Sequence, residues 1–104
     1  MSEIMRLISM LILLESGGND SAVGKGGELG CLQIKSCVVA DVNEWYGTSY
    51  VQEEMVERPK AVAVFRLYLS RWVPWYERRT GKRATFEVMR SLWQKGPKGT
   101  TGEF

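Results

Sequence analysis

The chain has 104 residues, of which 44% are hydrophobic and 25% charged, a composition typical of one globular domain rather than a disordered chain. Its net charge of +2 is too small to indicate a nucleic-acid partner by itself. Because the sequence contains no His, Ser-His-Asp and Cys-His nucleophile systems and His-ligated metal sites are excluded.

The first predicted element is a helix over residues 2–15, with Ser2 as its N-cap and Gly17-Gly18 as its stop. Apolar residues recur along it at helical spacing, at Ile4, Leu7, Ile8, Leu11 and Ile12. The apolar run 7–14 is far shorter than the roughly 20 residues that cross a bilayer, and no small-residue cleavage site follows it. We therefore expect a buried helix, no signal peptide and no stable membrane insertion.

Glu15 is predicted to lie on the apolar face of this helix, at its C-terminal end. Successive residues turn by about 100°, so Glu15 falls about 20° from Ile4 and about 40° from Leu11. A carboxyl group in that position loses hydration, and the helix C-terminus also disfavours its charged form. We therefore expect a raised pKa; the alternative, a solvated C-terminal Glu, fits the helical face less well.

Residues 16–35 contain six of the eleven glycines and are predicted to break away from helix. Short strands around residues 22–23 and 29–34, joined by a turn at 25–27, fit the pattern best. A Gly-rich loop of this length in a small domain tends to carry function. A phosphate-binding P-loop is not supported, because no Gly-Lys-Ser/Thr follows the glycines.

The two cysteines are Cys31 and Cys37, too few for a Cys-rich zinc or iron–sulfur site. Their spacing allows one bridge, but a single pair makes no disulfide framework. We expect two buried or half-buried thiols, with a disulfide as the alternative, and we expect no metal and no cofactor.

Three further helices are predicted. Ser36 is the expected cap of the second, which ends at Gly47, and one helical turn is expected over residues 52–56. Pro59 is the expected first residue of the third helix, and Pro74 is expected to end or kink it.

A basic stretch at residues 76–83 is expected to be a solvated turn, with a phosphate-binding patch as the alternative. Thr85 is expected to cap a fourth helix. Helical spacing assigns three tryptophans to the core: Trp45, Trp72 and Trp93. Three other aromatic residues lie outside the apolar stripes and are candidates for a ligand cleft: Tyr50, Trp75 and Tyr76.

Two linked motifs resemble a known superfamily. A Glu-Ser-Gly motif at residues 15–17 ends the first helix, and a Gly-x-x-Gln-Ile motif at residues 30–34 follows in the predicted strand region. In this order and spacing they resemble the lysozyme-like superfamily, in particular the small phage and bacterial domains of the soluble lytic transglycosylase and goose-type lysozyme group. Residues 38–43 and 65–69 are also similar to phage members, and the resemblance spans residues 4–99.

The resemblance implies a lysozyme-like fold of the α+β class, mainly α, with a small β-hairpin or Gly-rich element after the first helix. It implies a single domain over residues 1–104. It also implies cleavage of the β-1,4 bond between N-acetylmuramic acid and N-acetylglucosamine in peptidoglycan. Glu15 would protonate the leaving glycosidic oxygen, which requires a carboxyl group still protonated near neutral pH. The implied substrate-binding residues are Ser16, Gly30, Leu32, Gln33 and Gln94.

A second catalytic carboxylate is expected only if the enzyme is a hydrolase. Asp20 and Glu28 lie in the right segment for it, but neither matches a catalytic position of the resembling group. Lytic transglycosylases use one Glu, because the 6-hydroxyl group of the muramic acid attacks and gives a 1,6-anhydro product. Hydrolysis and transglycosylation therefore both remain open at this point.

The sequence departs from the resembling group after the last predicted helix. There it reads Trp93-Gln94-Lys95-Gly96-Pro97, with Gln94 in place of an expected Asn and Lys95 in place of a small residue. This departure motivates a second hypothesis, a degenerate, non-catalytic wall-binding or structural virion protein of the same fold. A nucleic-acid-binding helical domain would rest on the basic residues 78–83, and we do not expect that partner.

The expected partners are peptidoglycan glycan strands. A phage-type protein of this group would be made in the cytoplasm without a signal peptide. It would reach the cell wall or periplasm by holin-dependent release or together with other virion proteins. These expectations follow from the resemblance.

Overall fold

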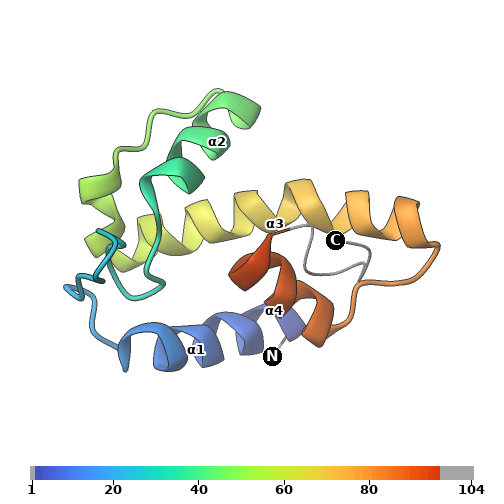
Figure 1. Ribbon diagram of the computed structural model, residues 1–104, viewed down its shortest axis with the longest axis horizontal. Coiled ribbons are helices and arrows are strands. Elements are labelled where there is room, and N and C mark those ends of the chain that lie inside the picture. Colours follow the sequence, from blue (N-terminus) through green and yellow to red (C-terminus); the bar gives the residue numbers. More distant parts are fainter. Residues whose placement is uncertain (1, 97–104) are drawn as a thin grey trace.

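The computed structural model describes residues 2–96, which form four α-helices and one 3-10 helix (Figure 1). The elements are α1 Glu3–Ser16, α2 Ser36–Tyr46, η1 Gln52–Val56, α3 Arg58–Thr80 and α4 Phe86–Lys95. The long helix α3 packs against α2, η1 and α4, and α1 packs against α4. The predicted mainly helical class is confirmed for the described residues.

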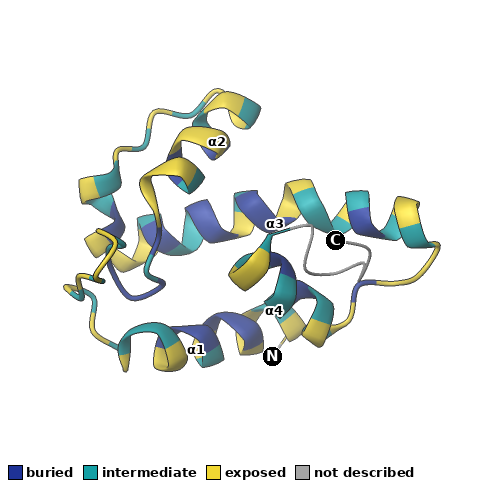
Figure 2. Ribbon diagram, viewed as in Figure 1, coloured by how far each residue is buried: buried dark blue, intermediate teal, exposed yellow. Residues whose placement is uncertain are grey.

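Helix α1 begins and ends where the sequence predicts. The Ser2 hydroxyl accepts a hydrogen bond from the Met5 backbone N–H at 3.3 Å, and Gly17 ends the helix with a φ of +63°. The Gly17 and Gly18 N–H groups donate to the Leu13 and Ile12 carbonyls at 2.9 and 3.2 Å. The predicted apolar stripe forms part of the core, through Leu7, Ile8, Leu11 and Ile12 (Figure 2).

The caps and turns of the later helices are partly as predicted. Thr85 caps α4 through a hydrogen bond from the Val88 N–H at 3.3 Å, and the turn over residues 52–56 is the 3-10 helix η1. The expected Ser36 cap is wrong, because Ser36 is the first residue of α2 and the cap residue Lys35 offers no side-chain oxygen.

Of the two outcomes predicted for Pro74, the end of the helix is wrong, because α3 continues past the proline to Thr80. Proline removes only one hydrogen bond from a helix, and tertiary packing on both sides can offset that loss. Trp72 and Trp75 lie partly buried against the core before and after Pro74, and Tyr76 is buried. Residues 76–80 of the basic stretch are therefore helical rather than a turn.

The Gly-rich segment 17–35 contains single bridges instead of the predicted strands. Leu29 forms antiparallel bridges with Val23 and with Ile34, and no strand extends from either. Positive φ angles at Gly27, Gly30 and Gln33 interrupt the extended backbone that a strand needs. The strands predicted at residues 22–23 and 29–34 therefore do not form.

Both cysteines are free thiols, with Cys31 buried and Cys37 exposed. The prediction of buried or half-buried thiols is confirmed for Cys31 and wrong for Cys37. Among the helices described, none combines the length and apolarity needed to cross a membrane. Pro97, the last residue of the segment that departs from the resembling group, lies outside the described residues.

Gly30 marks a close contact between the Gly-rich segment and η1. A Cβ atom placed on Gly30 would lie 1.8 Å from the Met55 carbonyl oxygen, whereas one placed on Gly27 meets no atom within 4 Å. The two glycines have nearly the same φ, +83° and +86°. Only Gly30 therefore has both a conformational and a steric reason to lack a side chain.

We expect Gly30→Ala to destabilise the fold more than Gly27→Ala. Both variants force alanine into positive φ, at a cost of about 1 kcal/mol or more each. Gly30→Ala should lose about a further 1–3 kcal/mol, because its Cβ displaces the η1 backbone. Urea unfolding followed by circular dichroism measures both free energies of unfolding. Equal losses in the two variants would contradict the close contact.

Candidate active site

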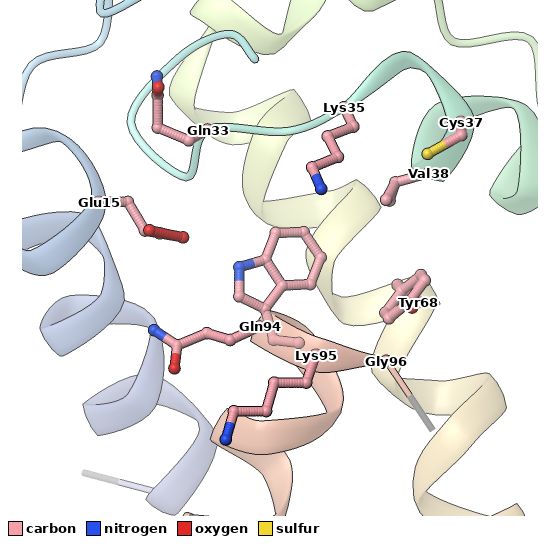
Figure 3. Close-up of a pocket in the computed structure, with 10 residues that line it drawn as sticks. Glu15, Gln33, Lys35, Cys37, Val38, Tyr68, Gln94, Lys95 and Gly96 are labelled. Atoms are coloured by element: carbon pink, nitrogen blue, oxygen red, sulfur yellow. The ribbon is translucent and has the colours of Figure 1, made fainter. Parts of the chain in front are cut away.

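A cleft of about 400 Å³ lies between the end of α1, the Gly-rich segment, the first turn of α2, and helices α3 and α4. Its volume is within the range of small-molecule sites. Three residues predicted to touch a ligand line it: Glu15, Gln33 and Gln94. Figure 3 shows these residues around the opening.

Glu15 reaches the cleft from the end of α1, and its carboxyl group points into the opening (Figure 3). The residue is half-buried, and desolvation by this burial is the main cause of its raised pKa. The negative charge of Glu28 raises the pKa further, whereas the positive charge of Lys35 lowers it. The predicted direction of the shift is confirmed.

The Ser16 side chain is occupied in joining two parts of the backbone. Its hydroxyl oxygen lies 2.8 Å from the Cys31 carbonyl and 2.9 Å from the Ile12 carbonyl, and it accepts a hydrogen bond from the Gly18 N–H at 3.2 Å. This links the end of α1 to the Gly-rich segment directly beside Glu15. Ser16 does not line the cleft, so its geometry favours positioning over direct substrate binding.

Gln33 lines the cleft, but its amide nitrogen forms hydrogen bonds within the Gly-rich segment. The Nε2 group donates to the Gly30 and Ala22 carbonyls at 2.9 and 3.1 Å. Its Oε1 atom forms no hydrogen bond with any residue from 2 to 96, and the amide points away from the Glu15 carboxyl group in Figure 3. A Cβ atom placed on Gly24 would lie 2.6 Å from this oxygen, so the oxygen faces the Gly-rich segment.

Two other predicted ligand contacts are structural in this geometry. Leu32 is fully buried in the core, and Gly30 is buried against the Met55 carbonyl. Neither residue lines the cleft. Both hold the Gly-rich segment in place, and Gln94 remains as an exposed side chain on the α4 wall.

Neither candidate for a second carboxylate lines the cleft. Asp20 Oδ1 accepts a hydrogen bond from Arg58 Nε at 2.7 Å, and the same guanidinium group donates to the Gly18 carbonyl at 2.9 Å. Glu28 lies over the backbone of the Gly-rich segment and influences Glu15 by its charge. Among residues 2–96, Glu15 is therefore the single carboxylate in the lining.

The remaining walls contain residues that the sequence did not single out for this site. Lys35, Cys37, Val38 and Tyr68 line the cleft together with Trp93, which also packs partly buried against the core, as predicted. The Tyr68 and Trp93 rings meet edge to face, with centroids 5.4 Å apart. The sequence feature that could have identified Tyr68 is its hydroxyl group among the buried apolar residues of α3.

The aromatic residues expected in a cleft lie elsewhere. Tyr76 is buried in the core, Trp75 packs against Trp72, and Tyr50 lies in the α2–η1 connection, partly buried against the core. The extension of α3 past Pro74 explains the first two, because it turns residues predicted to be in a loop into helix positions that pack. Trp45 and Trp72 lie partly buried against the core, as predicted.

No group of three or more His, Cys, Asp or Glu side chains among residues 2–96 is placed to hold a metal ion. Comparisons with known protein families, with curated proteins and with solved structures found no match for this chain.

We expect Glu15→Gln to stabilise the protein near neutral pH. The folded state raises the Glu15 pKa, so it binds the proton more tightly than the unfolded chain. Stability from this group is therefore present below the unfolded pKa and is lost as pH rises through the folded pKa. The amide of the Glu15→Gln variant carries no charge and avoids that loss. The gain in the free energy of unfolding should therefore vanish in acid, where the wild-type carboxyl group is also uncharged.

Urea midpoints across the pH range measure this difference. Glu3→Gln is the matched control, because Glu3 lies in the first turn of the same helix, where a negative charge is favourable. That variant should lose a few tenths of a kcal/mol near neutral pH. A Glu15→Gln variant that is less stable than the wild type near neutral pH would contradict the desolvated carboxyl group.

Proposed function

We propose that the protein is a peptidoglycan-cleaving glycosidase that acts on the β-1,4 bond between N-acetylmuramic acid and N-acetylglucosamine, with Glu15 as the general acid. One observation carries the proposal: a carboxyl group with a raised pKa opens into a cleft of about 400 Å³. Such a group keeps its proton closer to neutral pH than an ordinary Glu and can give it to a leaving oxygen. The order and spacing of the motifs at residues 15–17 and 30–34 support the same activity.

The lining of the cleft favours transglycosylation over hydrolysis. A two-carboxylate hydrolase needs its second carboxylate within reach of the same sugar ring, whereas Asp20 and Glu28 lie outside the lining. In the favoured reaction Glu15 protonates the glycosidic oxygen, and the C1–O bond breaks. The 6-hydroxyl oxygen of the muramic acid then bonds to C1 and returns its proton to the Glu15 carboxylate. The product carries a 1,6-anhydro ring, and no water is consumed.

The aromatic wall supports a sugar ligand. Trp93 packs against Phe65 and Tyr68, with ring centroids 4.7 and 5.4 Å away, so its position is fixed by contacts on two sides. A fixed ring offers apolar surface to a sugar without a large ordering cost on binding. The exposed Gln94 amide adds a polar contact at the edge of the same cleft.

We expect Glu15→Gln to reduce the rate of peptidoglycan cleavage about a hundredfold or more, which is the usual contribution of a general acid. Mass spectrometry of fragments from purified peptidoglycan should show 1,6-anhydro products with the wild type and their loss with the variant. Circular dichroism must show that the variant is folded.

Other products would change the proposal in defined ways. Reducing-end products lost in Glu15→Gln would identify a hydrolase and reopen the search for a second carboxylate. Absence of any product from folded wild type, together with retained binding to peptidoglycan, would support the non-catalytic wall-binding or virion alternative. This alternative is supported by Gln94 and Lys95, which depart from the resembling group and are exposed on the cleft wall.

We expect Glu28→Gln to shift the pH dependence of cleavage without abolishing it. Activity requires protonated Glu15, so it falls as pH rises through the Glu15 pKa. Removing the negative charge of Glu28 lowers that pKa and moves the falling limb to lower pH. Glu53→Gln on η1 is the control and should leave the limb unchanged. Complete inactivity of Glu28→Gln at every pH would contradict a purely electrostatic role.

A further inference from the structure

Lys35 places a positive charge in the cleft. It is the N-cap residue of α2 and follows the buried Ile34, and its ammonium group points into the opening, as the Glu15 carboxyl group does (Figure 3). Among residues 2–96, no carboxylate forms an ion pair with Lys35. The first turn of α2 contains no acidic residue, so its own helix does not neutralise it either.

The charge of the cleft is positive in the state that cleavage requires. Its charged lining residues are Glu15, Lys35 and Lys95, and its other titratable groups are the Cys37 thiol and the Tyr68 hydroxyl. When Glu15 is protonated, the lining carries two positive charges and no negative one. Such a cleft attracts an anion and disfavours an apolar or cationic group at the same place.

The position of Lys35 is unfavourable for the proposed acid unless an anion binds there. Its charge lowers the Glu15 pKa and so works against burial and against Glu28, which both raise it. An anion paired with Lys35 would cancel this effect. Binding of an anionic substrate would then help Glu15 to keep its proton at the moment of cleavage.

We propose that Lys35 is a specificity-determining residue that binds a carboxylate on the lactyl substituent of the muramic acid ring. The inference rests on the proposed function and adds the part of the substrate that the cleft recognises. The carboxylate has two sources with the same chemistry. In peptide-free glycan it is the lactyl carboxylate itself, and in peptide-bearing strands it belongs to the stem peptide.

The experiment compares three substrates: peptide-bearing strands, amidase-trimmed strands that keep only the lactyl carboxylate, and either strand after its carboxyl groups are converted to amides. The variants are Lys35→Met, Lys35→Arg and, as matched control, Lys25→Met. Lys25 is an exposed lysine of the Gly-rich segment that does not line the cleft. The readouts are KM, kcat and the pH of the falling limb.

Lys35→Met should raise KM about tenfold on carboxylate-bearing strands, because it removes one charge-assisted hydrogen bond to the substrate. It should leave KM on amidated strands unchanged. Lys35→Arg should keep most of the affinity, and Lys25→Met should behave as the wild type. With wild type, the falling limb should lie at higher pH on carboxylate-bearing strands than on amidated ones. The strand type with the larger effect identifies the source of the carboxylate.

The inference and the proposed function fail in different ways. If the wild type cleaves amidated and unmodified strands equally fast, and Lys35→Met does not change KM, the inference is overturned and the proposed glycosidase activity still holds. A second measurement applies if the protein is inactive. It compares the binding of a soluble muramyl oligosaccharide to the Glu15→Gln variant and to the double variant Glu15→Gln/Lys35→Met. Lys35-dependent binding without any cleavage by the wild type would uphold the carboxylate site and overturn the enzyme. Binding independent of Lys35 would overturn the site.

Discussion

The Ser16 hydroxyl group is the contact on which the candidate site most depends, because it joins α1 to the Gly-rich segment beside Glu15. One oxygen lies within hydrogen-bond distance of the Ile12 and Cys31 carbonyls and of the Gly18 N–H. A general acid is effective only when its carboxyl group is held close to one position relative to the reacting bond. The Ser16 side chain supplies that restraint at the residue next to the acid.

The Gly-rich segment has no sheet to satisfy its backbone, and side chains from other elements take that role. Arg58, at the start of α3, donates to the Gly18 carbonyl, and Gln52 of η1 donates to the Gly27 and Ile34 carbonyls at 2.9 and 3.1 Å. The Gln33 amide closes the loop on itself. Buried and half-buried backbone groups need such partners. Together with the Ser16 hydroxyl of α1, these contacts hold a segment with only single bridges from three helices: α1, η1 and α3.

The sequence was sufficient to predict the parts of the fold that depend on local patterns. The apolar stripe and caps of α1, the turn over residues 52–56 and the Thr85 cap all follow from neighbouring residues. The extension of α3 past Pro74 does not, because it depends on aromatic packing between helices. The missing strands depend in part on the positive φ of Gln33, a residue type that does not predict such a φ.

The site shows the same division between local and tertiary information. Helical spacing alone placed Glu15 on the buried face and gave the direction of its pKa shift. Spacing could not show that Gly30 contacts the Met55 carbonyl or that Asp20 pairs with Arg58, because these partners lie far along the chain. Predicted ligand contacts in the Gly-rich segment therefore divide into Gln33, which lines the cleft, and residues that support it.

Three electrostatic effects of different origin act on the Glu15 pKa, and their balance is consistent with the anionic ligand that we propose. Burial raises the Glu15 pKa already without a ligand, and Glu28, which raises it further, does not line the cleft. Lys35 lines the cleft and lowers the Glu15 pKa, and a ligand in the cleft can neutralise its charge directly. A carboxylate bound to Lys35 therefore removes the effect that opposes protonation and leaves the two that favour it. The acid would then be strongest in function when the correct substrate is bound, which couples recognition to catalysis through a single lysine.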